Sequence, residues 1–242
     1  MQGVNERIAL LEREYRKQKR QEAEKTETGQ SVKQEQTGQL EETLKHQRKE
    51  ITLENVLIAV RTGEVCLWGK QYLIERDYPE EKNFPEEDQG AKECYSLEVK
   101  SYFEDKIPMV LLKDVYTGRK EEEQAVIFVN HQQNISQVLT LADSRMGEES
   151  LDSWKKKLET GMKLVGTYVE VTQETSLEHL DYLIYRTPTG KGWIYSLLFR
   201  IHTGSGRAVG NYNCMEKDKK TYGILLEALL YRMNELLSEQ EG

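Results

Sequence analysis

The chain of 242 residues lacks any long apolar run and contains few cysteines. No segment approaches the roughly 20 consecutive apolar residues of a membrane-spanning helix, so we expect no membrane span. The first residues do not combine a basic segment with an apolar one, so we expect no signal peptide. The three cysteines, Cys66, Cys94 and Cys214, are too few and too scattered for a disulfide framework or a closed zinc site. These absences favour a cytoplasmic protein in a reducing environment.

Basic residues are in the minority, because 34 Lys and Arg stand against 42 Asp and Glu, and the formal net charge is −8. An acidic chain binds phosphate backbones poorly, so we expect no nucleic-acid partner. Hydrophobic residues make up only 37% of the chain. This fraction still allows one globular domain with polar extensions.

The common catalytic and cofactor motifs are also missing. Gly-x-Ser-x-Gly and His-Glu-x-x-His do not occur. The glycine-rich segment 204–210 leads into a predicted strand, whereas a phosphate-binding loop leads into a helix. The four histidines lie far apart, without the spacing of a metal site: His46, His131, His179 and His202. We therefore predict a protein without enzymatic activity, cofactor or metal.

Residues 1–50 form a polar N-terminal arm, which we predict to be helical or flexible. Four apolar residues in this arm follow each other at steps of four, three and four, which places them on one side of a helix. They are Val4, Ile8, Leu11 and Tyr15. This stripe is a candidate surface for a partner helix or a second copy of the chain. The alternative is a solvated tail.

Residues 51–93 form a lead-in segment followed by an acidic loop. Two short apolar runs flank Gly63, and either a helix followed by a strand or two strands would fit them. Prolines, a glycine and many carboxylates over 77–93 predict a solvated connection.

Residues 94–242 have the pattern of an α+β domain. Apolar steps of three and four predict helices over 150–165 and 221–237. Alternation with period two predicts strands over 95–103, 109–116, 125–129, 137–141, 168–173, 179–186 and 193–203, and a last one that ends at 215. Polar loops are expected after 116 and, as a six-residue turn, over 187–192. We predict one antiparallel sheet packed against a crossing helix and a C-terminal helix.

The strand 193–203 has two different faces. Its odd positions are apolar and predict a core face: Trp193, Tyr195, Leu197, Phe199 and Ile201. Its even positions are more polar and predict a face that is solvated or lines a site.

A four-residue loop at 204–207 is predicted to connect this strand to the next. In that register Phe199 faces Tyr212 on the core side, and Arg200 faces Asn211 on the polar side. A slip of one residue would mix the two faces, so the match of faces favours this loop. Cys214 is then predicted to be a buried core residue.

The order of elements over 95–238 resembles the PsbP-like and DcrB-like superfamily, in which an antiparallel sheet carries a crossing helix and a final helix. The matching parts are the strands 125–129 and 137–141, the two predicted helices, and the strands from 168 to 215. Members of that superfamily are mostly binding, scaffold or chaperone proteins, and bacterial members include adaptors that load secretion effectors. The resemblance implies a non-enzymatic binding role.

The polar face of the predicted sheet is the candidate site in the domain. It comprises Ser196, Arg200, His202, Asn211 and Asn213. An arginine binds a carboxylate with two hydrogen bonds, so this face would suit a polar or acidic peptide. The alternative is an ordinary solvated face.

We therefore predict a cytoplasmic adaptor or chaperone that binds a protein partner. Two other hypotheses stay open. One is an enzyme of unrecognised type that uses the face around Arg200 and His202. The other is a structural subunit that forms homo-oligomers through the N-terminal helix.

Overall fold

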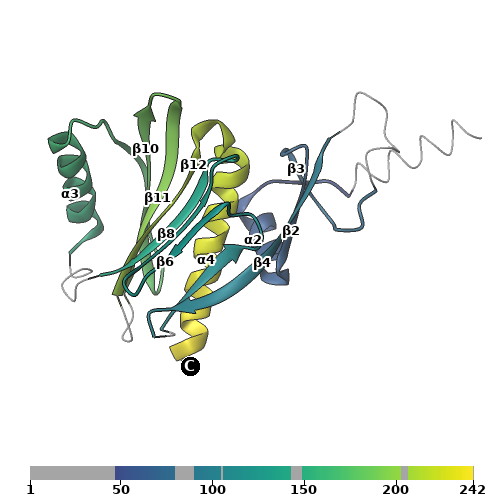
Figure 1. Ribbon diagram of the computed structural model, residues 1–242, viewed down its shortest axis with the longest axis horizontal. Helices are drawn as coiled ribbons and strands as arrows, with labels where there is room; N and C mark the ends of the chain where they lie inside the picture. Colours follow the sequence, from purple (N-terminus) through teal and green to yellow (C-terminus); the bar gives the residue numbers. More distant parts are fainter. Residues whose placement is uncertain (1–46, 80–89, 105, 143–148, 203–206, 242) are drawn as a thin grey trace, which may run out of the picture. The chain divides into compact units, whose positions relative to one another are not determined.

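The computed structural model, shown in Figure 1, describes residues 47–79, 90–104, 106–142, 149–202 and 207–241. By its internal contacts the chain divides into residues 1–48 and a larger unit, residues 49–242. The predicted helix with Val4, Ile8, Leu11 and Tyr15 lies outside the described residues. No helix in the described ranges is long and apolar enough to cross a bilayer.

The lead-in segment folds as a helix followed by strands. Helix α2 (Leu53–Thr62) starts after Thr52, whose hydroxyl accepts a hydrogen bond from the Asn55 N–H. It ends at Gly63, which has a φ of 86°, a conformation that suits glycine. Strands β2 (Glu64–Trp68) and β3 (Tyr72–Ile74) follow. Of the two alternatives, the helix followed by a strand is therefore the one observed, with one further short strand.

A five-stranded antiparallel sheet contains these two strands. It adds β1 (Lys49–Glu50), β4 (Lys92–Tyr102) and β5 (Ile107–Leu112), in the order β1-β3-β2-β4-β5. The lead-in segment thus belongs to the same compact unit as the strands that follow it.

A seven-stranded antiparallel sheet contains the remaining strands, in the order β6-β7-β8-β12-β11-β10-β9. They are β6 (Gly118–Glu121), β7 (Ala125–Asn130), β8 (Ile135–Leu141), β9 (Glu170–Ser176), β10 (Leu180–Thr189), β11 (Gly192–His202) and β12 (Arg207–Met215). The α+β class and its antiparallel pairing are confirmed, but the strands form two sheets where one was predicted. Strand β6 lies in the predicted polar loop, because its pairing with β7 supplies order that its own polar sequence does not signal.

Helix α4 (Ile224–Glu241) lies between the two sheets (Figure 1). It is preceded by a 3₁₀ turn (Glu216–Asp218) and a π-helical turn (Lys219–Gly223). Its buried apolar side chains point to more than one side of the helix: Leu225, Leu226, Ala228, Leu229, Leu230, Met233 and Leu237. They belong to one core with residues of both sheets. The predicted C-terminal helix that covers a sheet is confirmed, and it covers a second sheet and α2 as well.

Glu227 is a buried acid on α4. The hydroxyl of Tyr182, from the seven-stranded sheet, donates a hydrogen bond of 2.7 Å to its carboxyl group. Burial raises the pKa of Glu227 above its usual value. On a different part of the helix, Glu235 accepts hydrogen bonds from Arg61 of α2. These polar contacts fix the rotation of α4 between its neighbours.

The β11–β12 hairpin has a register two residues away from the predicted one. His202 pairs with Arg207, and Phe199 pairs with Gly210. The predicted pairs Phe199–Tyr212 and Arg200–Asn211 are therefore wrong, although a shift by two leaves every side chain on its predicted face. A Cβ on Gly210 would lie 2.0 Å from the Phe199 ring, so the glycine provides the room that the ring occupies.

The β10–β11 hairpin is longer than predicted. Thr189 pairs with Gly192, so only Gly190 and Lys191 form the turn, and the predicted six-residue turn is wrong. Trp193, expected in the core, is 37% exposed because it lies near the tip of this hairpin. Its ring contacts that of Tyr168 at a centroid distance of 6.0 Å.

Cys66 and Cys94 form a disulfide bond between β2 and β4. The two residues are direct cross-strand partners in the sheet, although they are 28 positions apart in the sequence. Their description as scattered cysteines without a disulfide is therefore wrong. Cys214 is buried and free, as predicted, and burial raises the pKa of its thiol to about 12.

We expect Gly210→Ala to destabilise the protein by about 2 kcal/mol or more, because the added methyl group overlaps the ring of Phe199. Urea unfolding measures this change. The matched control is Gly161→Ala, on the exposed side of α3 (Leu151–Leu164), where a Cβ meets nothing within 4 Å. That control should stabilise the helix by about 0.5–1 kcal/mol. Equal effects at both positions would contradict the observed register.

We expect Cys214 alone to react with iodoacetamide in the denatured, unreduced protein, and all three cysteines to react after reduction. Intact-mass spectrometry counts the modified thiols. Reduction should also lower the free energy of unfolding by about 3 kcal/mol, since it opens a closed loop in the unfolded chain. The Cys66→Ser variant should be insensitive to reduction. Three reactive thiols without reduction would contradict the disulfide.

Candidate functional site

The outer face of the seven-stranded sheet is the face that points away from α4. Helix α3 lies beside this face, next to β10 and β11 (Figure 1). Ser150 caps α3, since its hydroxyl accepts a hydrogen bond from the Ser153 N–H. Strand β11 contributes its even positions to this face: Ile194, Ser196, Leu198, Arg200 and His202. The five predicted polar residues all lie here, but in two separate groups.

The first group centres on Arg200, which is only 4% exposed. Its Nε and Nη2 atoms donate hydrogen bonds of 2.9 and 2.7 Å to Oδ2 of Asp181 on β10. Nη2 also donates to the Glu149 carbonyl, just before α3. The guanidinium lies over the ring of Trp154, on α3, at 4.8 Å from the ring centroid. This ion pair and ring contact attach α3 to the sheet.

Asp181 accepts a further hydrogen bond of 2.6 Å from the Ser176 hydroxyl. Burial alone would raise the pKa of Asp181, but the hydrogen bonds from Ser176 and Arg200 outweigh it and lower the pKa. The half-buried His202 lies with its Nε2 atom 3.5 Å from Oδ1 of the same carboxylate. The charged groups of this cluster thus interact with one another. The carboxylate that Arg200 was predicted to bind on a partner is supplied by Asp181 of the same chain.

The second group contains Ser196, Asn211 and Asn213. Asn213 pairs with Ser196 across the strands, and its Oδ1 atom accepts a hydrogen bond of 2.8 Å from the Ser136 hydroxyl of β8. The amide of Asn211 donates to the Tyr185 hydroxyl at 3.4 Å. The Oδ1 atom of Asn211 is buried and accepts no hydrogen bond. This group therefore has unused hydrogen-bonding capacity.

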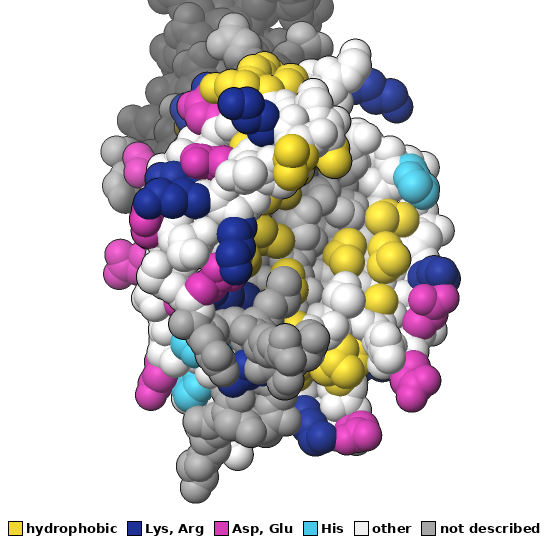
Figure 2. Space-filling model, turned by 90° about the vertical axis from the view of Figure 1, so that its left-hand side faces the viewer, with side chains coloured by type: hydrophobic (Ala, Val, Ile, Leu, Met, Phe, Trp, Pro, Cys, Tyr) yellow, Lys and Arg dark blue, Asp and Glu magenta, His cyan; other side chains and the backbone are white. Residues whose placement is uncertain are grey.

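Apolar side chains surround the second group. Figure 2 shows this side of the molecule hollowed along its middle, with apolar side chains inside the hollow and charged side chains around it. We call this part of the outer face the trough. Its apolar residues are half-buried, and they come from four adjacent strands: Ile127, Val129, Val138, Ile194, Leu198, Val209 and Met215.

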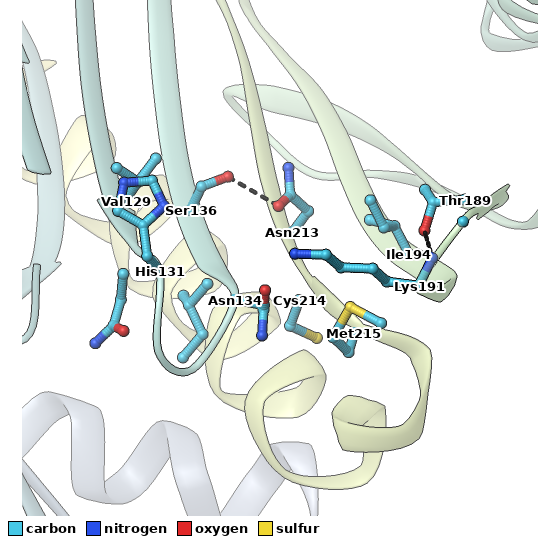
Figure 3. Close-up of a pocket in the computed structure, with 13 residues that line it drawn as sticks. Val129, His131, Asn134, Ser136, Thr189, Lys191, Ile194, Asn213, Cys214 and Met215 are labelled. Atoms are coloured by element: carbon cyan, nitrogen blue, oxygen red, sulfur yellow. Dashed lines mark hydrogen bonds between the residues drawn. The ribbon is translucent and has the colours of Figure 1, made fainter. Parts of the chain in front are cut away.

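A pocket of about 400 Å³ lies at one end of the trough (Figure 3). It arises because β12 ends at Met215, while the hairpins on both sides of it extend further. The turn between β7 and β8 forms one wall, and the turn between β10 and β11 forms the other. We call this pocket the notch. It is lined by Val129, Asn130, His131, Asn134, Ile135, Ser136, Thr189, Gly190, Lys191, Ile194, Asn213, Cys214 and Met215.

Hydrogen bonds fix the turn between β7 and β8, which forms one wall of the notch. Asn130 accepts hydrogen bonds from the backbone N–H groups of Gln132 and Gln133 and shapes the turn. The side chain of Gln133 donates to the hydroxyl of Tyr95 on β4. The turn is therefore fixed against the five-stranded sheet, and the notch keeps its shape without a ligand.

The described residues contain no group of three His, Cys, Asp or Glu side chains placed to hold a metal ion. Cys214 borders the notch, but its raised pKa of about 12 keeps the thiol protonated and a poor nucleophile.

Several residues of the first group and of the notch were not found from the sequence. Asp181 pairs with Arg200 and is one of the alternate residues of β10 that point to the outer face. A search for charged residues at those alternate positions would have found it. Lys191 was assigned to a long turn, and His131 was judged only by its distance from the other histidines. Their meeting at one pocket follows from strand order, which the sequence does not encode locally.

We expect Asp181→Asn to destabilise the protein by about 3 kcal/mol, because it leaves the buried charge of Arg200 without its partner. Urea unfolding at neutral pH measures the change. The control is Glu174→Gln, which breaks the solvent-exposed pair with Lys155 and should cost less than about 1 kcal/mol.

The advantage of wild type over Asp181→Asn should depend on pH. Because folding lowers the pKa of Asp181, its contribution is fully present above about pH 4, the usual range of an Asp carboxyl. It should shrink as the pH falls through the lower pKa of the folded state. An advantage that grows on acidification would contradict this assignment.

Comparison with solved structures finds similar folds at low sequence identity. The cyanobacterial PsbP protein (CyanoP) from Synechocystis sp. PCC 6803 is 13% identical, with a TM-score of 0.43 over 56% of this chain and 89% of that one. A protein of unknown function from Pseudomonas aeruginosa, PA94, is 8% identical, with a TM-score of 0.37 over 55% and 93%. No family model and no curated protein matches the chain. The PsbP-like and DcrB-like superfamily was expected from the sequence, and a PsbP protein is among the structures that the comparison finds.

Proposed function

We propose that the protein is a non-enzymatic adaptor or chaperone that binds a segment of a protein partner in the trough. The observation that carries this proposal is the trough itself. Seven half-buried apolar side chains lie side by side on a sheet face that α3 leaves open, beside amide groups with unused hydrogen-bonding capacity. Apolar patches of this kind, bordered by polar residues, are typical of protein-binding surfaces.

The arrangement of the polar groups favours binding over catalysis. Arg200 and Asp181 are engaged with each other and with α3, which gives them a structural role. His202 faces the same carboxylate. An enzyme that used this end of the face would need these groups to be available to a substrate. The trough, in contrast, offers contact area without an activated nucleophile.

The mixed lining of the trough indicates the chemistry of the partner segment. Valine, isoleucine and leucine side chains would contact apolar side chains of the segment. We therefore infer a segment with an apolar face.

The hypotheses on oligomers and location stay predictions. Self-assembly through Val4, Ile8, Leu11 and Tyr15 concerns residues outside the described part of the chain. A cytoplasmic location was inferred from scattered cysteines, and the Cys66–Cys94 pair bears on it, since disulfides persist mainly in oxidising compartments. The count of free thiols in protein from the native cells tests this point.

We expect Val138→Lys to abolish capture of the partner, because it places a charge in the middle of the apolar trough. The full-length protein, tagged in its native host, is purified with its partners, which are identified by mass spectrometry. The matched control is Val99→Lys, a change of the same kind on β4, where Val99 is 53% exposed. A partner that binds wild type and Val99→Lys but not Val138→Lys supports the proposal. A set of partners unchanged by Val138→Lys would overturn it.

A further inference from the structure

The notch is a non-acidic pocket on an acidic protein. The chain has 42 Asp and Glu residues and a net charge of −8. None of the thirteen residues that line the notch, all of them in the described part of the chain, is acidic. Lys191 from one hairpin and His131 from the other contribute the basic groups. The lining itself therefore suits a negatively charged ligand better than a positively charged one, while Glu216 and Asp218, which follow Met215 in the chain, add negative charge near Cys214.

Two hydrogen-bond donors in the notch have no acceptor of their own. The Ser136 hydroxyl donates to the side-chain oxygen of Asn213, so the amide nitrogen of Asn213 points away from this contact. In Figure 3 the ammonium end of the Lys191 side chain extends across the notch toward Asn213. Within the described ranges, no carboxylate forms an ion pair with Lys191, and the Asn213 amide donates no hydrogen bond. Lys191 and Asn213 both line the notch, and an ammonium and an amide are both groups that donate hydrogen bonds to a carboxylate.

The floor of the notch is apolar. Val129, Ile194 and Met215 line it from the outer face, and the buried Ile135 lines it from the turn. A volume of about 400 Å³ holds one residue-sized group with its carboxylate, and it lies within the range of small-ligand sites. The suited ligand thus combines a carboxylate with an apolar group close to it.

The position of the notch suits the end of a partner chain. It opens onto the trough at one end only of β12, and beyond Met215 the chain turns into the segment Glu216–Asp218 (Figure 3). A partner segment that lies in the trough and stops in the notch needs no exit. The last residue of a peptide carries its carboxylate and its side chain on the same carbon atom. Such a residue can place its carboxylate at the donors and its side chain on the apolar floor beside them. An internal Asp or Glu has no apolar group beside its carboxylate.

We propose that the notch binds the C-terminal carboxylate of a partner chain whose last residue is apolar. Lys191 and the Asn213 amide bind the carboxylate, and the floor around Met215 binds the last side chain. This proposal rests on the proposed function, since it assigns the end of the segment that occupies the trough.

The test uses the full-length protein and two pools of synthetic peptides. In both pools the last residue is Leu, Val or Phe and the preceding positions are randomised; one pool ends in a free carboxylate and the other in an amide. Peptides retained by the protein are identified by mass spectrometry, and their Kd values are measured by fluorescence anisotropy. N-acetyl-leucine serves as the probe for a small carboxylate.

We expect retained peptides to come from the free-acid pool, and amidation to weaken their binding about tenfold or more. Lys191→Gln and the isosteric Asn213→Asp should weaken it about tenfold as well. Asn213→Asp keeps the acceptor for Ser136, so the strand pairing is preserved while a charge repels the ligand. The matched control Lys113→Gln, an exposed lysine after β5, should have no effect.

Four results would overturn the proposal: equal binding of acid and amide, no effect of Lys191→Gln and Asn213→Asp, no retained free-acid peptide, or binding of N-acetyl-leucine as tight as that of the peptides. The first two are separable from a failure of the proposed function. If a peptide binds equally well as acid and as amide but does not bind Val138→Lys, it still occupies the trough, and only the assignment of the notch fails. Peptides that bind equally well to wild type, Val138→Lys and Lys191→Gln, together with an unchanged set of partners of Val138→Lys in the native host, would reject both proposals.

Discussion

The burial of α4 between two sheets is the constraint on which the rest of the structure depends. A helix that is apolar on most of its circumference needs cover on more than one side. The seven-stranded sheet covers one side, where Tyr182 donates its hydrogen bond to Glu227, and α2 with β5 covers another. Because one face of the large sheet packs against α4, the opposite face is the one that carries α3 and the trough. The position of the trough thus follows from where α4 is buried.

The attachment of α3 decides how much of the outer face stays open. The contacts of Arg200 with Asp181 and Trp154 hold the helix over β10 and β11, near one end of the face. The neighbouring strands β7, β8 and β12 keep half-buried side chains. A buried ion pair adds little net stability over an apolar contact, but it requires one geometry. Here that geometry leaves the trough beside the helix.

The sequence predicted the elements that have strong local patterns. The helices α3 and α4, the strand β11 and the burial of Cys214 were all predicted from spacing and confirmed, but Val165 and Trp193, at the ends of two of these patterns, are exposed. Spacing also placed Ser196, Arg200, His202, Asn211 and Asn213 on one face. It could not separate registers that differ by two residues, since both keep the same faces. The contact of Phe199 with Gly210 decides between them, and that contact exists only in the folded sheet.

Features that depend on pairing between distant segments were missed. The polar strand β6, the division into two sheets and the Cys66–Cys94 bond all require strand order, which no local pattern reports. The notch is a further example, because its walls come from two hairpins and its depth from the early end of β12. The sequence could therefore identify candidate residues along one strand, but it could not identify which residues of the adjacent strand lie next to them.

The Cys66–Cys94 bond has a consequence for the integrity of the chain. It joins β2 to β4, and the stretch of chain between its two cysteines contains β3 and the acidic segment that follows it. A protease that cuts the backbone anywhere between these cysteines would produce two fragments that remain covalently linked. In a denaturing gel the cut molecule would migrate as one species without a reducing agent, and it would separate into two fragments only after reduction.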